Sequence, residues 1–108
     1  MSDVLARLQS TIAARRNVSP DSSYVSRLFH KGEDACLKKV AEEAAELIMA
    51  AKDKDQHHLI KEAADLWFHI LVTLNYYGLT LSDVENELEL REGTSGLVEK
   101  ARRNAPNE

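Results

Sequence analysis

The 108-residue sequence has one cysteine, two prolines and four glycines, and only 6% of its residues are aromatic. Its single cysteine, Cys36, excludes an internal disulfide and fits a reducing compartment such as the cytoplasm. No apolar run approaches the ~20 residues that a membrane-spanning helix needs, and the N-terminus lacks the pattern of a secretory signal. We therefore expect one cytoplasmic domain over residues 1–108, with a modest aliphatic core and no membrane partner.

The sequence also lacks the basic excess that is typical of a nucleic-acid-binding surface. Lys and Arg together number 14 against 18 acidic residues, and the formal net charge is −4. Five of the acids lie in two short clusters, and leaving these five out of the count gives 13 acidic residues against 14 basic ones. The acidity is therefore local, and the balance argues against nucleic acid as a partner. The clustered acids are Glu42, Glu43, Glu46, Glu62 and Asp65.

Helical periodicity of apolar residues dominates the chain, and alternating strand patterns are nearly absent. We expect an all-α bundle of about five helices, in which a short loop makes the two central helices antiparallel neighbours. Asp55 and Thr80 are expected to cap helix starts, with Asp83 completing a capping box, and Gly78 is expected in the left-handed position after a helix. The expected helices cover residues 3–15, 24–30, 34–52, 56–77 and 81–91, followed by a short helix at 97–103.

Two pairs of carboxylates are spaced i, i+3 in the central helices: Glu43 with Glu46, and Glu62 with Asp65. Each pair shares a helical face, where like charges weaken an isolated helix by about 0.2–0.5 kcal/mol. Antiparallel packing would bring the four together, and a hard cation such as Mg²⁺ or Mn²⁺ would offset their repulsion. Carboxylate-held Mg²⁺ usually completes its shell with water and substrate phosphates. The pattern therefore predicts metal-assisted phosphoryl or pyrophosphoryl chemistry.

A plain structural interpretation of the same residues is also possible. Strings of the form EExxE are common on solvated helices, whereas an ExxD pair inside a mostly apolar helix is harder to explain by solvent exposure. The helix expected over residues 56–77 is apolar nearly all round. Such a helix is usually buried on several sides, which in a chain this small indicates an oligomer interface. His69 is expected to be a hydrogen-bonded core or boundary residue, and His57 and His58 are expected to be exposed.

The EExxE string followed by ExxD about sixteen residues later resembles the metal-binding signature of the all-α nucleoside triphosphate pyrophosphohydrolases, the MazG-like superfamily. A longer set of residues resembles the phosphoribosyl-ATP pyrophosphohydrolase family of histidine biosynthesis. The sequence departs from that family at Ala41, where glycine is common, and alanine is a good helix former. The matching segments are Ser23-Tyr24, Arg27-Leu28, Lys31-Gly32, Lys38-Lys39-Val40, Glu42-Glu43-Ala44, Glu62-Ala63-Ala64-Asp65-Leu66 and Gly93-Thr94-Ser95-Gly96.

This resemblance implies a homodimer that hydrolyses phosphoribosyl-ATP to phosphoribosyl-AMP and pyrophosphate, the second step of the pathway. It also implies that Mg²⁺ is held by Glu43, Glu46, Glu62 and Asp65. Glu42 becomes the candidate catalytic residue, which positions or deprotonates water or holds a second metal. The candidates for binding substrate phosphates are Arg27, Lys31, Lys38 and Lys39.

Two alternatives stay open at this point. The first is a housecleaning pyrophosphohydrolase that acts on canonical or damaged nucleotides, although residues 24–39 match the histidine-pathway family better. The second is a non-catalytic helical dimerisation module whose acidic residues only solvate one face. A substrate panel distinguishes the first alternative from hydrolysis of phosphoribosyl-ATP. Thermal melting with and without Mg²⁺ distinguishes the second, because a cation that binds the folded chain raises its stability.

Overall fold

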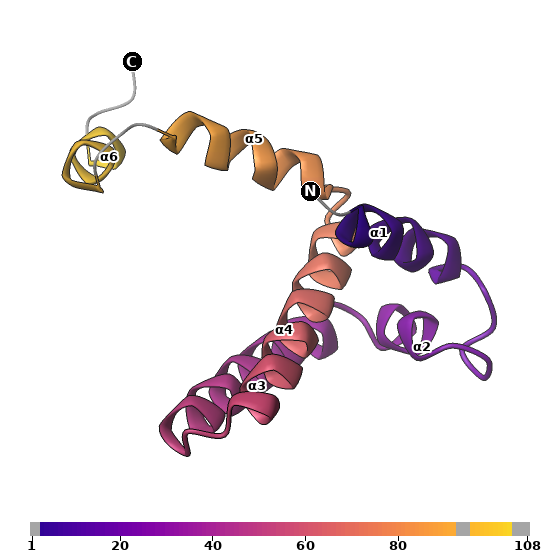
Figure 1. Ribbon diagram of the computed structural model, residues 1–108. Helices are drawn as coiled ribbons and strands as arrows, with labels where there is room; N and C mark the ends of the chain where they lie inside the picture. The colour runs from indigo at the N-terminus through magenta and orange to yellow at the C-terminus, as the bar shows by residue number, and fades with distance from the viewer. Residues whose placement is uncertain (1–2, 93–95, 105–108) are drawn as a thin grey trace.

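The computed structural model describes residues 3–92 and 96–104, and every regular element within these ranges is an α-helix (Figure 1). The prediction of an all-α fold is therefore confirmed, with six helices in the described ranges where a bundle of about five was expected. Of the family-matching segment Gly93-Thr94-Ser95-Gly96, only Gly96 lies within the described residues, where it begins α6. The helices are α1 (Val4–Arg15), α2 (Tyr24–Lys31), α3 (Glu33–Lys52), α4 (Gln56–Tyr76), α5 (Leu81–Arg91) and α6 (Gly96–Arg103).

Side-chain caps set the starts of several helices, as the sequence predicts. The Asp55 carboxylate accepts the backbone N–H of His58 at 3.1 Å and begins α4. At the start of α5, the Asp83 carboxylate accepts the backbone N–H of Thr80 at 2.8 Å, which is the acidic half of a capping box. Ser23 caps α2 by accepting the backbone N–H of Ser26. Each cap satisfies a donor that the first helical turn leaves free.

Two left-handed turns end the two central helices. After α4, Gly78 has φ 73°, and the backbone N–H of Leu79 donates to the Leu74 carbonyl at 2.8 Å, which confirms the expected position of this glycine. After α3, Lys54 takes the same position with φ 60°, and the backbone N–H of Asp55 donates to the Ala50 carbonyl at 3.4 Å. Both are Schellman-type helix ends. The Lys54 turn reverses the chain and makes α3 and α4 an antiparallel hairpin.

Gly32 alone joins α2 to α3. Its φ of 101° and ψ of −171° lie in a region of backbone space that is essentially restricted to glycine. A β-carbon built at Gly32 would meet no heavy atom within 4 Å, so the constraint comes from the backbone and not from crowding. The tight link fixes the direction in which α3 leaves α2.

The α3–α4 hairpin makes the most extensive helix contact of the fold, and α1 and α2 pack beside it (Figure 1). The main core lies where α1, α2, the start of α3 and the C-terminal half of α4 meet, with Leu81 of α5 at its edge, and it includes Cys36. α5 touches α1 at its start, where the Leu81 backbone N–H donates to the Gln9 side chain, and then extends away from the other helices. None of the described helices is long and apolar enough to cross a membrane. The buried core residues are Ile12, Val25, Leu28, Cys36, Leu71, Val72 and Leu81.

Candidate metal centre

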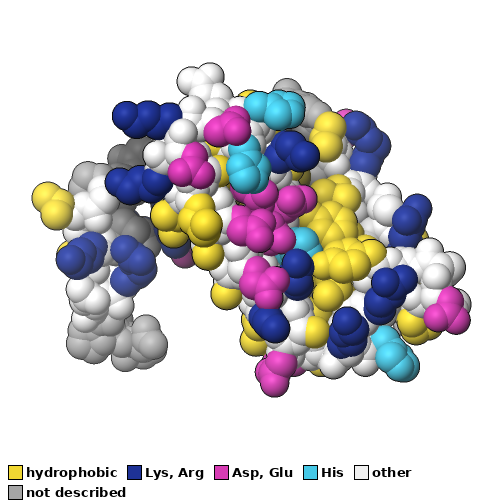
Figure 2. All heavy atoms as spheres, turned by 90° about the horizontal axis from the view of Figure 1, so that it is seen from below, with side chains coloured by type: hydrophobic (Ala, Val, Ile, Leu, Met, Phe, Trp, Pro, Cys, Tyr) yellow, Lys and Arg dark blue, Asp and Glu magenta, His cyan; other side chains and the backbone are white. Residues whose placement is uncertain are grey.

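The central hairpin brings three of the predicted ligands together. Glu43 of α3 and Glu62 and Asp65 of α4 each offer an oxygen, and these oxygens all lie within 4.8 Å of one another. Glu43 and Glu62 are buried, with 6% and 7% of their surface exposed, whereas Asp65 is exposed. The centre therefore has a closed side between the helices and an open side at Asp65. Seen from below, the molecule has a group of acidic side chains near the middle of its surface, with hydrophobic side chains beside it (Figure 2).

The fourth predicted ligand, Glu46, is exposed and lies at the edge of this group. Its effect is visible on Glu62, whose carboxyl pKa is raised above the ordinary value of 4.5. Burial is the main cause of the higher pKa, and the neighbouring carboxyls of Glu46 and Glu43 add to it. His58 acts in the opposite direction, because its Nε2 lies 2.9 Å from Glu62 Oε1. The carboxylate form of Glu62 is thus disfavoured unless a positive charge is present.

Two buried oxygens in this centre have no hydrogen-bond partner within the described part of the chain: Oε2 of Glu43 and Oε2 of Glu62. An unpartnered buried carboxylate oxygen is costly, so it needs either a proton or a cation. The donors offered here are all carboxylate oxygens, which is the set that Mg²⁺ and Mn²⁺ prefer. The residues present therefore fit a hard divalent cation.

Glu42, the predicted catalytic residue, lies half-buried beside the centre and is paired with two lysines. Lys39 Nζ donates to Glu42 Oε2 at 3.3 Å and lies 3.4 Å from Glu43 Oε1, while Lys38 Nζ is 3.8 Å from Glu42 Oε1. Burial lowers the pKa of Lys39, but its hydrogen bonds to Glu42 and Glu43 outweigh this effect and the pKa is raised. Lys39 therefore keeps its charge at the rim of the acidic group, and Lys38 is largely exposed.

The predicted cations of α2 lie on the side of that helix that carries Tyr24. Tyr24, Arg27 and Lys31 are spaced i, i+3 and i+7, so they share one helical face. Arg27 and Lys31 are exposed, and Arg27 Nε donates to the Pro20 carbonyl at 3.3 Å. Both remain accessible to a ligand that approaches this face.

Two histidines beside the centre differ in how well the sequence predicted them. His69 is buried and hydrogen-bonded, as expected: its Nδ1 lies 2.7 Å from the Asp65 carbonyl oxygen and its Nε2 lies 2.9 Å from the Tyr24 hydroxyl. His58 is exposed, as the sequence predicts, but its contact with Glu62 is not predicted. The signal was available, because residues four apart face each other on a helix.

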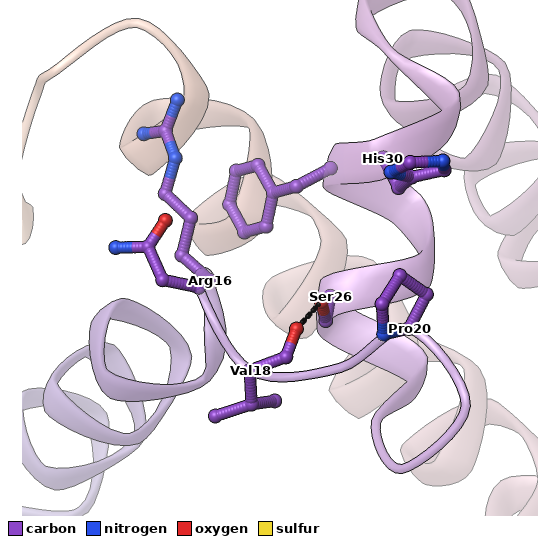
Figure 3. A pocket seen from close by; sticks show the side chains of 7 residues that line it. Arg16, Val18, Pro20, Ser26 and His30 are labelled. Atoms are coloured by element: carbon purple, nitrogen blue, oxygen red, sulfur yellow. Dashed lines mark hydrogen bonds between the residues drawn. The ribbon is translucent and has the colours of Figure 1, made fainter.

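A separate pocket of about 300 Å³ opens between the α1–α2 loop and the face of α2 turned away from Tyr24 (Figure 3). Ser26 and His30 line it from α2, and the Ser26 hydroxyl donates to the Val18 carbonyl. Arg16 lies at its edge, where its guanidinium carbon is 4.6 Å from the centre of the Phe29 ring. Among the described residues that line this pocket, none belongs to the predicted site.

Fold and site together define the class: an all-α protein whose central hairpin builds a carboxylate centre suited to a hard divalent cation. Comparison with known proteins gives the family. Residues 5–92 match the family described as phosphoribosyl-ATP pyrophosphohydrolase. The chain belongs to this family, which confirms the resemblance seen in the sequence.

Curated relatives agree over nearly the whole chain. The phosphoribosyl-ATP pyrophosphatase of Chromobacterium violaceum is 63% identical over 101 residues, which cover 94% of each protein. The protein of the same name from Methylibium petroleiphilum is 59% identical and covers 94% of this chain and 84% of its own length. That of Neisseria gonorrhoeae is 54% identical over 100 residues, or 93% of this chain and 94% of the relative.

Proposed function

We propose that this chain is a cytoplasmic, Mg²⁺-dependent homodimer that hydrolyses phosphoribosyl-ATP to phosphoribosyl-AMP and pyrophosphate, the second step of histidine biosynthesis. Family membership supports the reaction and the substrate. The observation that carries the metal is the pair of buried, unpartnered oxygens of Glu43 and Glu62 beside Asp65. Mn²⁺ is an acceptable substitute, because the donors are all oxygens.

Glu43, Glu46, Glu62 and Asp65 would hold the cation. When bound, it would neutralise negative charge on the triphosphate and on the leaving pyrophosphate. Glu43 and Glu62 supply the closed side of the centre, while Asp65 and Glu46 are exposed. The triphosphate therefore approaches from the exposed side, where the remaining positions of the cation would be free for water and phosphate oxygens.

Glu42 is the residue that we assign to water. Its carboxylate orients the water and takes its proton as the water oxygen bonds to the α-phosphorus. The bond between the α-phosphorus and the bridging oxygen breaks at the same time, and pyrophosphate leaves. Lys38 and Lys39 keep Glu42 in place beside the ligands, with their Nζ atoms 3.8 and 3.3 Å from its carboxylate oxygens. With Arg27 and Lys31 they form the basic rim that binds the substrate phosphates.

Exposed apolar side chains on the central hairpin support the homodimer. Ile60 and Trp67 lie seven residues apart on one face of α4 and are 68% and 44% exposed. Ile48 of α3 is 62% exposed. Large apolar side chains grouped on the same hairpin are typical of an interface. Sedimentation analysis of a Trp67→Glu variant tests this part: we expect a monomer where the wild-type protein is a dimer.

The activity is tested with purified protein, phosphoribosyl-ATP and a pyrophosphate assay. We expect Mg²⁺-dependent release that chelation abolishes, and loss of turnover in an Asp65→Asn variant that keeps its helical circular dichroism. Asp21→Asn, which removes an exposed carboxylate from the α1–α2 loop, is the matched control and should keep wild-type turnover. Strong hydrolysis of dCTP or dUTP with none of phosphoribosyl-ATP would instead favour a housecleaning enzyme.

A further inference from the structure

We propose that Tyr24 contacts the substrate as a hydrogen-bond acceptor, and that His69 is the positioning residue that fixes the Tyr24 hydroxyl in this role. The inference rests on the proposed function, because it places Tyr24 in the same site. Neither residue is a metal ligand in that proposal, and the proposed reaction assigns no task to either of them.

The partners of His69 determine the direction of its hydrogen bonds. Its Nδ1 lies 2.7 Å from the carbonyl oxygen of Asp65, and because a carbonyl oxygen only accepts, Nδ1 must carry the hydrogen. In the neutral ring Nε2 is then an acceptor, and the atom 2.9 Å away from it is the Tyr24 hydroxyl oxygen. We therefore assign the Tyr24 O–H as the donor to His69. Only 6% of His69 is exposed, so water does not compete for this bond.

This arrangement leaves the Tyr24 hydroxyl oxygen able to accept a further hydrogen bond but not to donate one. A phenol has a single proton, and in Tyr24 that proton is used by His69, so the hydroxyl oxygen can only accept from a further partner. The ring is fixed as well, since it stacks on Phe68 at 6.3 Å and meets the His69 ring edge-on at 5.8 Å. Yet 44% of Tyr24 is exposed, which is more than a purely structural brace requires.

The position of Tyr24 links the carboxylates to the cations of α2. His69 follows Asp65 by four residues on α4, which places it about 6 Å along the helix axis from Asp65. Lys39 and Glu43 are close enough to act on the pKa of the Tyr24 hydroxyl, which burial raises, Lys39 lowers and Glu43 raises. On its own helix, Tyr24 shares a face with Lys31.

In phosphoribosyl-ATP the ribose that carries the triphosphate, the adenine base and a second ribose lie between the triphosphate and the far phosphate. With the triphosphate on the carboxylates and the far phosphate on α2, we place the ribose that carries the triphosphate at Tyr24. The hydrogen-bond donors at that part of a nucleotide are the ribose hydroxyls. The Tyr24 oxygen, prepared to accept, is therefore complementary to a ribose hydroxyl and not to a phosphate oxygen, which has no proton to give. This accounts for a tyrosine, and not a further lysine, between the two charged regions.

The first test compares two phenols in full-length protein with Mg²⁺ and phosphoribosyl-ATP. Tyr24→Phe removes the proposed acceptor, and we expect kcat/KM to fall about tenfold, which is the size of one lost hydrogen bond. Tyr77→Phe is the matched control, because the Tyr77 hydroxyl donates to Glu33 at 2.7 Å, outside the centre. It should keep wild-type kinetics. Equal kinetics in wild type and Tyr24→Phe would overturn the inference and leave the proposed function intact.

The second test asks whether His69 acts through Tyr24. His69→Leu removes the acceptor for the phenol and should lower kcat/KM, whereas His69→Gln, whose side-chain oxygen reaches a similar place, should restore most of it. In a Tyr24→Phe background, His69→Leu should cause no further loss. If the two losses multiply, or if glutamine fails to rescue a variant that melts at the wild-type temperature, His69 has only a structural role. Failure of the wild-type protein to release pyrophosphate would remove the proposed function and this inference together.

Discussion

The carboxylates of Glu43 and Glu62 meet between α3 and α4, and each keeps one buried oxygen that no group in the described ranges hydrogen-bonds. Burial raises the pKa of the Glu62 carboxyl, and the neighbouring Glu46 and Glu43 raise it further. Glu43 and Glu62 nevertheless lie in the most extensive helix contact of the fold. Unless a proton or a cation lies between them, the two carboxylates therefore oppose this helix contact.

Replacing Glu62 by glutamine should separate stability from metal binding. We expect Glu62→Gln to melt at or above the wild-type temperature without metal, because the change removes a buried charge that burial and its neighbours disfavour. Millimolar Mg²⁺ should raise the melting temperature of the wild type but not that of the variant. A ligand at a hundred times its Kd adds about 2.7 kcal/mol to the free energy of unfolding.

The measurement is differential scanning calorimetry with Mg²⁺ and with chelator. Glu87→Gln, an exposed position on α5 paired with Arg91, serves as the control and should respond to Mg²⁺ like the wild type. An equal upward shift in Glu62→Gln would show that the cation binds elsewhere.

Substitutions at Gly32 and at Gly78 should differ sharply in how much they lower the free energy of unfolding. Gly32→Ala forces a β-carbon into backbone angles that only glycine adopts easily, and we expect a loss of about 1–3 kcal/mol in the free energy of unfolding. Gly78→Asn should cost much less, because asparagine tolerates the left-handed turn at φ 73°. Urea denaturation of both variants checks this, and similar losses would contradict it.

Arg16 should stabilise the fold through its planar guanidinium. Its Nη1 donates to the Asn75 carbonyl at 2.7 Å, and the group covers the Phe29 ring. We expect Arg16→Met, which keeps the aliphatic length, to lower the free energy of unfolding by about 1–3 kcal/mol. Arg15→Met, at the exposed last residue of α1, should change it by less than about 0.5 kcal/mol. Chemical denaturation measures both, and equal effects would show that the guanidinium contacts contribute nothing.

Tyr77 gives the chain a pH-dependent contribution to stability at high pH. Its hydrogen bond to Glu33, followed by burial, raises the pKa of Tyr77 from 10.0 to about 12. A pKa raised on folding means that the stabilisation is present below pH 10.0 and is lost as the pH rises towards about 12. The difference in unfolding free energy between wild type and Tyr77→Phe should shrink across that window. A constant difference would show that the phenol proton is not involved.

Local signals in the sequence predicted much of the fold. Asp55 and Thr80 lie at helix starts and Gly78 lies after a helix, because capping and left-handed turns depend on one or two residues and their immediate neighbours. The two i, i+3 carboxylate pairs likewise follow from helical spacing alone. The family resemblance rests on the same short motifs, and the comparison with known proteins confirms it.

What could not be predicted depends on how the helices are rotated against each other. Spacing treats Glu43 and Glu46 alike, yet packing buries the first and leaves the second exposed. The contact of Arg16 with Asn75 joins residues 59 positions apart, and no local pattern announces it. His58 is an intermediate case. Its spacing to Glu62 is visible in the sequence, but the burial of Glu62, whose effect on the pKa His58 opposes, is not.

The reversal of the chain at Lys54 means that every proposed metal ligand belongs to one continuous helical hairpin. One residue inserted between Glu46 and the turn would rotate Glu43 and Glu46 about 100° away from Glu62 and Asp65. Substitutions in α1, α2 or α5 leave the spacing of these ligands along the chain unchanged. The spacing of the four proposed ligands thus depends on a single chain reversal, whereas Arg27 and Lys31, which we propose to bind substrate, belong to the separate helix α2.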